Sequence, residues 1–187
     1  MRKMFFFVLT AAALLLMVPT QNAQAQSRSR SETPKVEVGV QYSLLRFTDA
    51  DVTDSGVGGR VTLNTSDNFS LETEFNFFPQ GRLNFANLSS LNSRRMQGLF
   101  GAKYGIRTEK FGVFGKVRPG FIRFGEGSSP IGTAATEFAL DIGGVFELYP
   151  SRPIALRFDV GNTLIRFGAL DNTSNNLQFT TGVAFRF

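Results

Sequence analysis

Residues 176–187 read N-L-Q-F-T-T-G-V-A-F-R-F, and this stretch decides the fold. Its alternate positions are apolar or nearly so: Leu177, Phe179, Thr181, Val183, Phe185 and Phe187. The positions between them are small or polar, and strict alternation of this kind predicts a β-strand with one apolar face and one polar face. The apolar face continues to the last residue of the sequence. This favours a strand in contact with lipid, because a barrel in a membrane must be apolar over its outer surface.

The start of the sequence has the features of a cleaved signal peptide. A basic beginning is followed by an apolar run from Met4 to Val18 and by a small-x-small cleavage site at Ala23-Gln24-Ala25. The run is short for a membrane-spanning anchor. We therefore expect residues 1–25 to be removed on export, residues 26–34 to be a polar, disordered lead-in, and residues 35–187 to form one domain.

The composition excludes several classes of function. The chain contains no histidine and no cysteine, which removes histidine-dependent catalysis, thiol nucleophiles and thiolate metal sites. Its formal net charge of +5 is spread along the sequence without a basic run, so nucleic-acid binding has little support. Glu72 and Glu74 lie two residues apart and could form a catalytic pair, but ion pairing with neighbouring bases is favoured. We expect no enzyme activity and no cofactor.

The domain divides into eight alternating segments, which predict strands at residues 35–48, 57–64, 69–78, 94–107, 111–124, 137–149, 153–165 and 176–187. The connections after the second, fourth and sixth segments are short, and the others are long, so that short and long alternate without exception. Short periplasmic turns and long outer loops give this order. The sequence therefore predicts an all-β, eight-stranded antiparallel up-and-down transmembrane barrel with both chain ends on the periplasmic side.

One face of this predicted sheet carries a balanced set of six acids and six bases: Glu37, Arg60, Glu72, Glu74, Lys103, Lys116, Arg118, Asp141, Glu147, Arg157, Asp159 and Arg186. The other face is almost uncharged through the middle of every strand. An eight-stranded barrel is just wide enough inside for side chains, and buried charges are tolerated when they are paired. We therefore expect an interior ion-pair network that plugs the barrel. A narrow pore for ions or small solutes and a soluble, lipocalin-like carrier stay open as alternatives.

The chain resembles the small eight-stranded outer-membrane barrels, namely the OmpX-like proteins and the OmpA transmembrane domain. The resemblance rests on the architecture and on the terminal Phe185-Arg186-Phe187. It implies a monomer in the bacterial outer membrane, with a role in envelope structure or in surface interaction through the outer loops. It also implies that Phe185 and Phe187 belong to the signal that the barrel-assembly machinery recognises. Since the sequence ends at Phe187, we expect no peptidoglycan-binding domain after the barrel.

Four arginines lie on the lipid-facing parity at the outer ends of the predicted strands: Arg46, Arg94, Arg123 and Arg166. No acid shares that parity there. Guanidinium groups bind phosphates through paired hydrogen bonds, and lipopolysaccharide presents phosphates at this height. A lipopolysaccharide-binding rim is one interpretation, and snorkelling or solvated charge is the other.

Two of the outer loops contain further candidates. Asp49 to Asp54 resembles a calcium loop, but its third acid is one place late for an EF-hand, which favours an ordinary solvated loop. Pro79 to Ser93 carries Phe85, Leu88 and Leu91, and we expect it to be the main contact surface for a partner.

Overall fold

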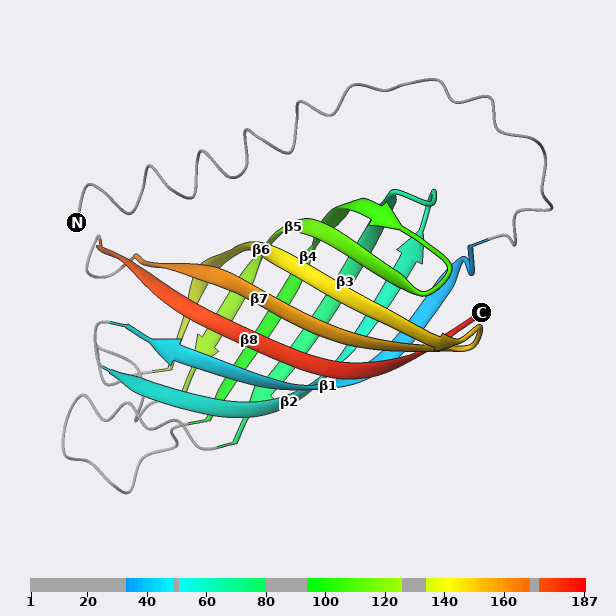
Figure 1. The fold of residues 1–187 in the computed structure, drawn as a ribbon. Coiled ribbons are helices and arrows are strands. Elements are labelled where there is room, and N and C mark those ends of the chain that lie inside the picture. Colours follow the sequence, from blue (N-terminus) through cyan, green and yellow to red (C-terminus); the bar gives the residue numbers. More distant parts are fainter. Residues whose placement is uncertain (1–32, 49–50, 80–93, 126–133, 169–171) are drawn as a thin grey trace. The chain divides into compact units, whose positions relative to one another are not determined.

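The computed structural model describes residues 33–48, 51–79, 94–125, 134–168 and 172–187. They form eight antiparallel strands that close into a barrel in sequence order (Figure 1). The strands are β1 (Val36–Phe47), β2 (Val52–Asn64), β3 (Phe69–Phe78), β4 (Arg95–Arg107), β5 (Phe111–Phe124), β6 (Ala135–Ser151), β7 (Ile154–Phe167) and β8 (Asn172–Arg186). The predicted eight-stranded barrel is confirmed. In the described part of the chain, no helix has the length and apolar character needed to cross a membrane.

Two strands begin at least four residues earlier than the alternation predicted. β2 starts at Val52 instead of residue 57, and β8 starts at Asn172 instead of residue 176. The added residues continue the ladders, where Phe47 pairs with Val52 and Phe167 pairs with Asn172. The outward side chains on these extensions are polar, Thr53 among them, and exposed. Backbone pairing therefore continues beyond the point where the apolar pattern stops.

The prediction that short and long connections alternate without exception is wrong. Residues 48–51 join β1 to β2 and residues 168–171 join β7 to β8, and these outer connections are as short as the turn at residues 65–68. The two strand extensions account for the difference, because they use residues that the sequence pattern assigned to loops. The remaining outer connections, residues 79–94 and 125–134, are the long ones.

Several predictions concern residues outside the described ranges. These are the signal peptide at residues 1–25, most of the lead-in at residues 26–34, and the apolar residues Phe85, Leu88 and Leu91 of the second outer loop.

The outer surface of the barrel is apolar, as contact with lipid requires. Side chains of one parity point outwards along every strand. Those that are more than half exposed include Val40, Val57, Phe100, Tyr104, Ile106, Val113, Val117, Phe138, Val160, Leu177, Phe185 and Phe187. A sheet with this exterior and a charged interior is the reverse of a lipocalin, whose apolar residues line the ligand cavity.

Candidate functional site: the barrel interior and its outer rim

Arg118 occupies the middle of the interior and connects four strands. This side chain on β5 is fully buried. Its Nε and Nη2 donate to Asp141 Oδ2 on β6, at 2.9 and 2.6 Å. Its Nη1 donates to Glu74 Oε2 on β3 at 2.6 Å, and Nη2 lies 3.4 Å from Asp159 Oδ2 on β7. One guanidinium group therefore bonds three of the predicted acids.

Arg157 on β7 forms a second centre next to the first. Its guanidinium donates from both terminal nitrogens to the two carboxylate oxygens of Glu72, and from Nη2 to Asp159 Oδ2 at 2.8 Å. Its Nη1 also lies 3.3 Å from Glu147 Oε1. Lys103 bonds Glu147 directly and has its Nζ 3.3 Å from Glu72 Oε1. Because Asp159 contacts both arginines, the two centres form one continuous network.

The last two predicted bases at this level have different surroundings. The Nζ of Lys116 lies 2.6 Å from Asp141 Oδ2 and also pairs with Asp159. Arg60 is buried as well, but its Nη1 donates to the amide oxygen of Gln41 at 3.2 Å. No carboxylate of the described residues lies within ion-pairing distance of Arg60. The structure therefore places Arg60 in the interior without an ion pair.

The periplasmic end of the interior contains a group of polar contacts. Arg186 Nε donates to Glu37 Oε1 at 3.3 Å, and its guanidinium lies 4.0 Å from the centre of the Tyr149 ring. The Tyr149 hydroxyl donates to Glu147 Oε2 at 2.7 Å and accepts a hydrogen bond from Arg107 Nε at 3.1 Å. Arg107 shares the inward parity of Lys103 four residues earlier, but it was not included in the predicted ion-pair network.

Towards the outer end, amide and hydroxyl groups replace the charges. The Gln97 and Gln178 amides exchange hydrogen bonds of 3.0 and 3.1 Å across the barrel. Gln178 also accepts from the Thr163 hydroxyl at 2.8 Å. Asn76 Nδ2 links this layer to the charged one, because it donates to Gln97 at 2.9 Å and to Glu74 at 2.7 Å.

The outermost interior layer is apolar and was not predicted. Its buried members are Leu45, Phe47, Phe78, Leu99, Ile122, Phe124, Ala139 and Ile165. An ion pair between Arg95 and Asp54 lies within this layer, with both side chains fully buried. The Arg95 guanidinium is 4.8 Å from the Phe47 ring centre and 5.5 Å from that of Phe124. This layer, called the apolar plug below and defined by the eight residues above, lies in the outer part of the barrel interior.

The placement of Asp54 also argues against the calcium loop. Asp54 faces the interior, whereas Asp51 pairs with Arg46 on the outside at 2.5 Å. Two acids of that segment thus point to opposite faces of the sheet and do not converge on one ion. Across the described ranges, no group of three or more histidine, cysteine or acidic side chains could hold a metal ion.

The structure separates the four predicted rim arginines. Arg46 on β1 pairs with Asp51, so the prediction that no acid lies near that parity is wrong for this residue. Arg166 on β7 stands opposite Phe138 in the ladder with β6. Arg94, immediately before β4, and Arg123, near the end of β5, line one pocket together.

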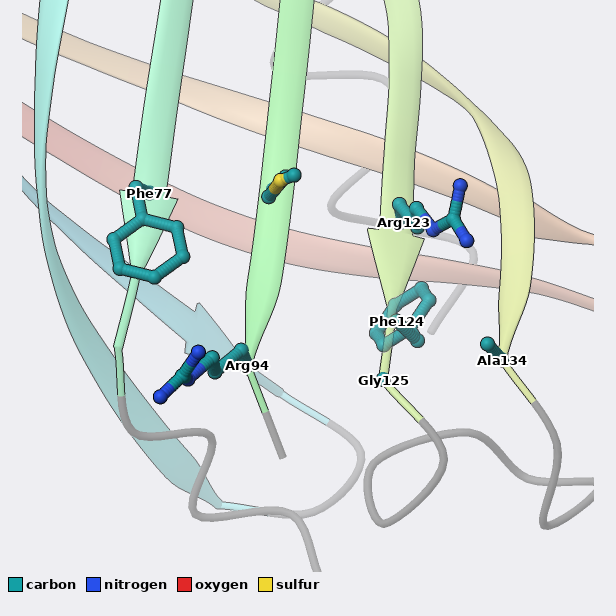
Figure 2. A pocket seen from close by; sticks show the side chains of 7 residues that line it. Phe77, Arg94, Arg123, Phe124, Gly125 and Ala134 are labelled. Atoms are coloured by element: carbon teal, nitrogen blue, oxygen red, sulfur yellow. The ribbon is translucent and has the colours of Figure 1, made fainter. Parts of the chain in front are cut away.

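This rim pocket lies at the outer ends of β3, β4, β5 and β6 (Figure 2). The residues that line it include Phe77, Arg94, Met96, Arg123, Phe124 and Ala134. Both arginines and Ala134 are exposed, whereas Phe77 and Met96 are half-buried and Phe124 is buried. The pocket therefore combines two cationic groups with an apolar floor.

The two terminal phenylalanines lie on the lipid-facing side. Phe185 is 58% exposed and Phe187 is 73% exposed. The backbone of Phe187 exchanges hydrogen bonds with Val36, at 2.8 and 3.2 Å, where the last strand meets the first. Both aromatic side chains are thus accessible from outside the barrel.

A comparison with protein families matches residues 10–187 to the outer membrane protein beta-barrel domain. No protein of curated function matches the chain.

Several solved structures share the fold. The N-terminal β-barrel domain of OprF from Pseudomonas aeruginosa is 11% identical, with a TM-score of 0.61 over 83% of this chain and 100% of that one. Ail of Yersinia pestis, solved in complex with the heparin analogue sucrose octasulfate, is 14% identical, with a TM-score of 0.53 over 84% and 100%. Neisserial surface protein A is 11% identical, with a TM-score of 0.54 over 81% and 96%.

Proposed function

The chain belongs to the outer membrane protein beta-barrel domain family, and we propose that it acts as a closed, non-enzymatic barrel in the outer membrane. In this proposal the filled interior stabilises the protein, and the outer rim and outer loops make the contacts with partners. The role is therefore one in envelope structure or surface interaction. Export by residues 1–25 and recognition of Phe185 and Phe187 by the assembly machinery are part of the same proposal.

The burial of the interior is the observation that supports a closed barrel. Glu72, Lys103 and Arg118 in the charged layer are each at most 1% exposed. Ile122 and Phe124 in the apolar plug are 0% exposed. Surfaces next to an internal water channel would be accessible to water, so these values support an interior without a continuous water path.

The contacts of the charged groups also support a closed barrel. A conducting pore needs ionic groups that interact with passing ions, whereas Arg118 and Arg157 here direct their donors at Glu72, Glu74 and Asp159. These pairs would have to open before an ion could replace one of the partners. Opening them is costly, because each would leave a charge buried without its partner.

Planar-bilayer recording of the purified, folded protein tests this proposal. We expect no steady conductance and no discrete open-channel steps from the wild type. Protease protection of the same preparation in vesicles provides the control that the barrel is inserted. Reproducible steps from inserted wild-type protein would refute the closed barrel and favour the narrow pore.

A further inference from the structure

We propose that the rim pocket between β3 and β6 binds a multiply phosphorylated lipid of the outer leaflet, with Arg94 and Arg123 holding its phosphates. Lipopolysaccharide is such a lipid. The inference rests on the proposed location of this end of the barrel at the outer surface of the membrane. It differs from a general basic rim, because it assigns binding to one pair of arginines.

The sheet register places the two arginines in the outermost rows of the lipid-facing surface. Arg123 lies opposite Met96 on β4 and Thr136 on β6. Arg94 lies one row further out, where its carbonyl accepts a hydrogen bond from the Gly125 amide at 2.9 Å. The two guanidinium groups are therefore carried by neighbouring strands at the end of the barrel where lipid headgroups lie.

The next row towards the membrane centre is aromatic. The ladders align Phe75, Gly98, Phe121 and Phe138 across β3, β4, β5 and β6. The three phenylalanines are 45–53% exposed. Gly98 has no side chain to separate them, and the Phe121 ring covers it, since a Cβ built there would come within 2.7 Å of that ring. This row, roughly 7 Å below Arg123 at two residues of strand rise, offers a flat apolar surface for acyl chains.

Arg123 distinguishes the pocket from the β1 side of the rim. Arg46, across the barrel on β1, is already paired with Asp51 at 2.5 Å. Among the described residues, no acid forms an ion pair with Arg123. Guanidinium groups bind phosphate oxygens through paired, charge-assisted hydrogen bonds, and this geometry suits an anionic headgroup better than a neutral one.

The directions of the two side chains indicate more than one phosphate. Figure 2 shows Arg94 extending towards the β3 side, below Phe77, whereas Arg123 extends towards β6. The guanidinium groups thus lie on opposite sides of the pocket. This arrangement suits a headgroup with two separated phosphates better than a single phosphate.

Binding to purified lipopolysaccharide provides the test. The folded full-length protein in detergent would be titrated with lipopolysaccharide, with dephosphorylated lipopolysaccharide and with inorganic phosphate, and the bound fraction would be measured by native mass spectrometry. The double variant Arg94→Gln/Arg123→Gln removes the two cationic groups of the pocket. The matched control is Arg46→Gln/Arg166→Gln, which removes two arginines from the same rim outside the pocket.

We expect the pocket variant to bind lipopolysaccharide at least about tenfold more weakly than wild type, because it loses the charge-assisted hydrogen bonds of both guanidinium groups to the phosphates. The control variant should bind within about threefold of wild type, since Arg46 has an acid of its own. Equal losses in both variants would mean diffuse attraction to the rim and would overturn the assignment. So would unchanged binding by the pocket variant, or inorganic phosphate competing as strongly as the lipid. Failure of the protein to insert into phospholipid vesicles would instead refute the proposed function, and this is measured before any lipopolysaccharide is added.

Discussion

Replacing Arg118 by methionine should destabilise the barrel more than replacing an exposed arginine by methionine. Arg118 is the only cationic partner of Glu74 within ion-pairing distance among the described residues, at 2.6 Å. The other two acids keep a base: Asp141 retains Lys116 at 2.6 Å, and Asp159 retains Arg157 at 2.8 Å. Arg118→Met therefore leaves one buried carboxylate with only the Asn76 amide, 2.7 Å away.

The size of the loss follows from that single unpaired charge. Breaking a buried ion pair by removing one partner costs roughly 3–5 kcal/mol, and we expect Arg118→Met to fall in this range. Glu74→Gln should cost less, roughly 1–3 kcal/mol, because Arg118 keeps Asp141 and Asp159. The double variant removes both charges of the pair. It should cost less than the sum of the single variants by roughly 1–3 kcal/mol.

Equilibrium unfolding in urea from lipid vesicles, followed by the electrophoretic shift between folded and unfolded barrel, measures these free energies. Arg46→Met is the matched control, since it breaks the exposed pair with Asp51 and should cost less than about 1 kcal/mol. The reasoning fails if Arg118→Met is no more destabilising than Arg46→Met. It also fails if the effects of Arg118→Met and Glu74→Gln add to within about 0.5 kcal/mol.

Two further predictions concern packing and assembly. Gly161→Ala should destabilise the barrel by about 1–3 kcal/mol in the same unfolding assay, because its Cβ would come within 2.4 Å of Asp141 Oδ1. Gly115→Ala is the control: the nearest atom to its Cβ would be 3.9 Å away, so it should change the free energy of unfolding by less than about 0.5 kcal/mol. Phe187→Asp should lower the amount of protein in the outer-membrane fraction of cells at unchanged synthesis, because it places a charge on the lipid-facing side of the last strand. Phe187→Tyr should assemble normally. Equal yields of wild type and Phe187→Asp would contradict the role of Phe187 in the assembly signal.

The bounds of the strands were predictable where the outward and inward side chains differ most in polarity. The bounds of β3 at residues 69–78 and of β5 at residues 111–124 agree with the sequence pattern. The starts of β2 and β8 were missed because the outward residues there are polar. Asp54 was assigned to a loop for the same reason, and its interior partner Arg95 was overlooked beside the outward-facing Arg94.

The partners within the interior were not predictable from strand register alone. Arg118 does bond Asp141, which stands directly opposite it in the ladder. Arg60 stands directly opposite Glu74 in the same way, yet Arg60 bonds Gln41 and Glu74 bonds Arg118 two strands away. In a narrow closed barrel, long side chains reach across the lumen, so contact depends on their length and direction as much as on cross-strand position.

The apolar plug shows a second limit of the alternation rule. Alternation along β4 turns Leu99 inwards, but it gives no reason to expect Leu99 to gather with Phe78 and Phe124 at one end. Polarity along the interior changes from charged to amide to apolar. Alternation distinguishes only inward from outward residues, so it does not predict this change of polarity along the barrel axis.

The alternation of β5 limits which changes in chain length the protein can tolerate. Lys116 and Arg118 face the interior, and Val117 between them faces lipid. One inserted residue upstream of Lys116 would exchange the two faces for the rest of the strand. Each base moved into lipid would destabilise the barrel by roughly 2–4 kcal/mol near the bilayer middle. The carboxylates that it leaves unpaired in the interior would destabilise the barrel further. Single-residue insertions and deletions should therefore survive only in the connections, whereas the strands can change length only by two residues at a time.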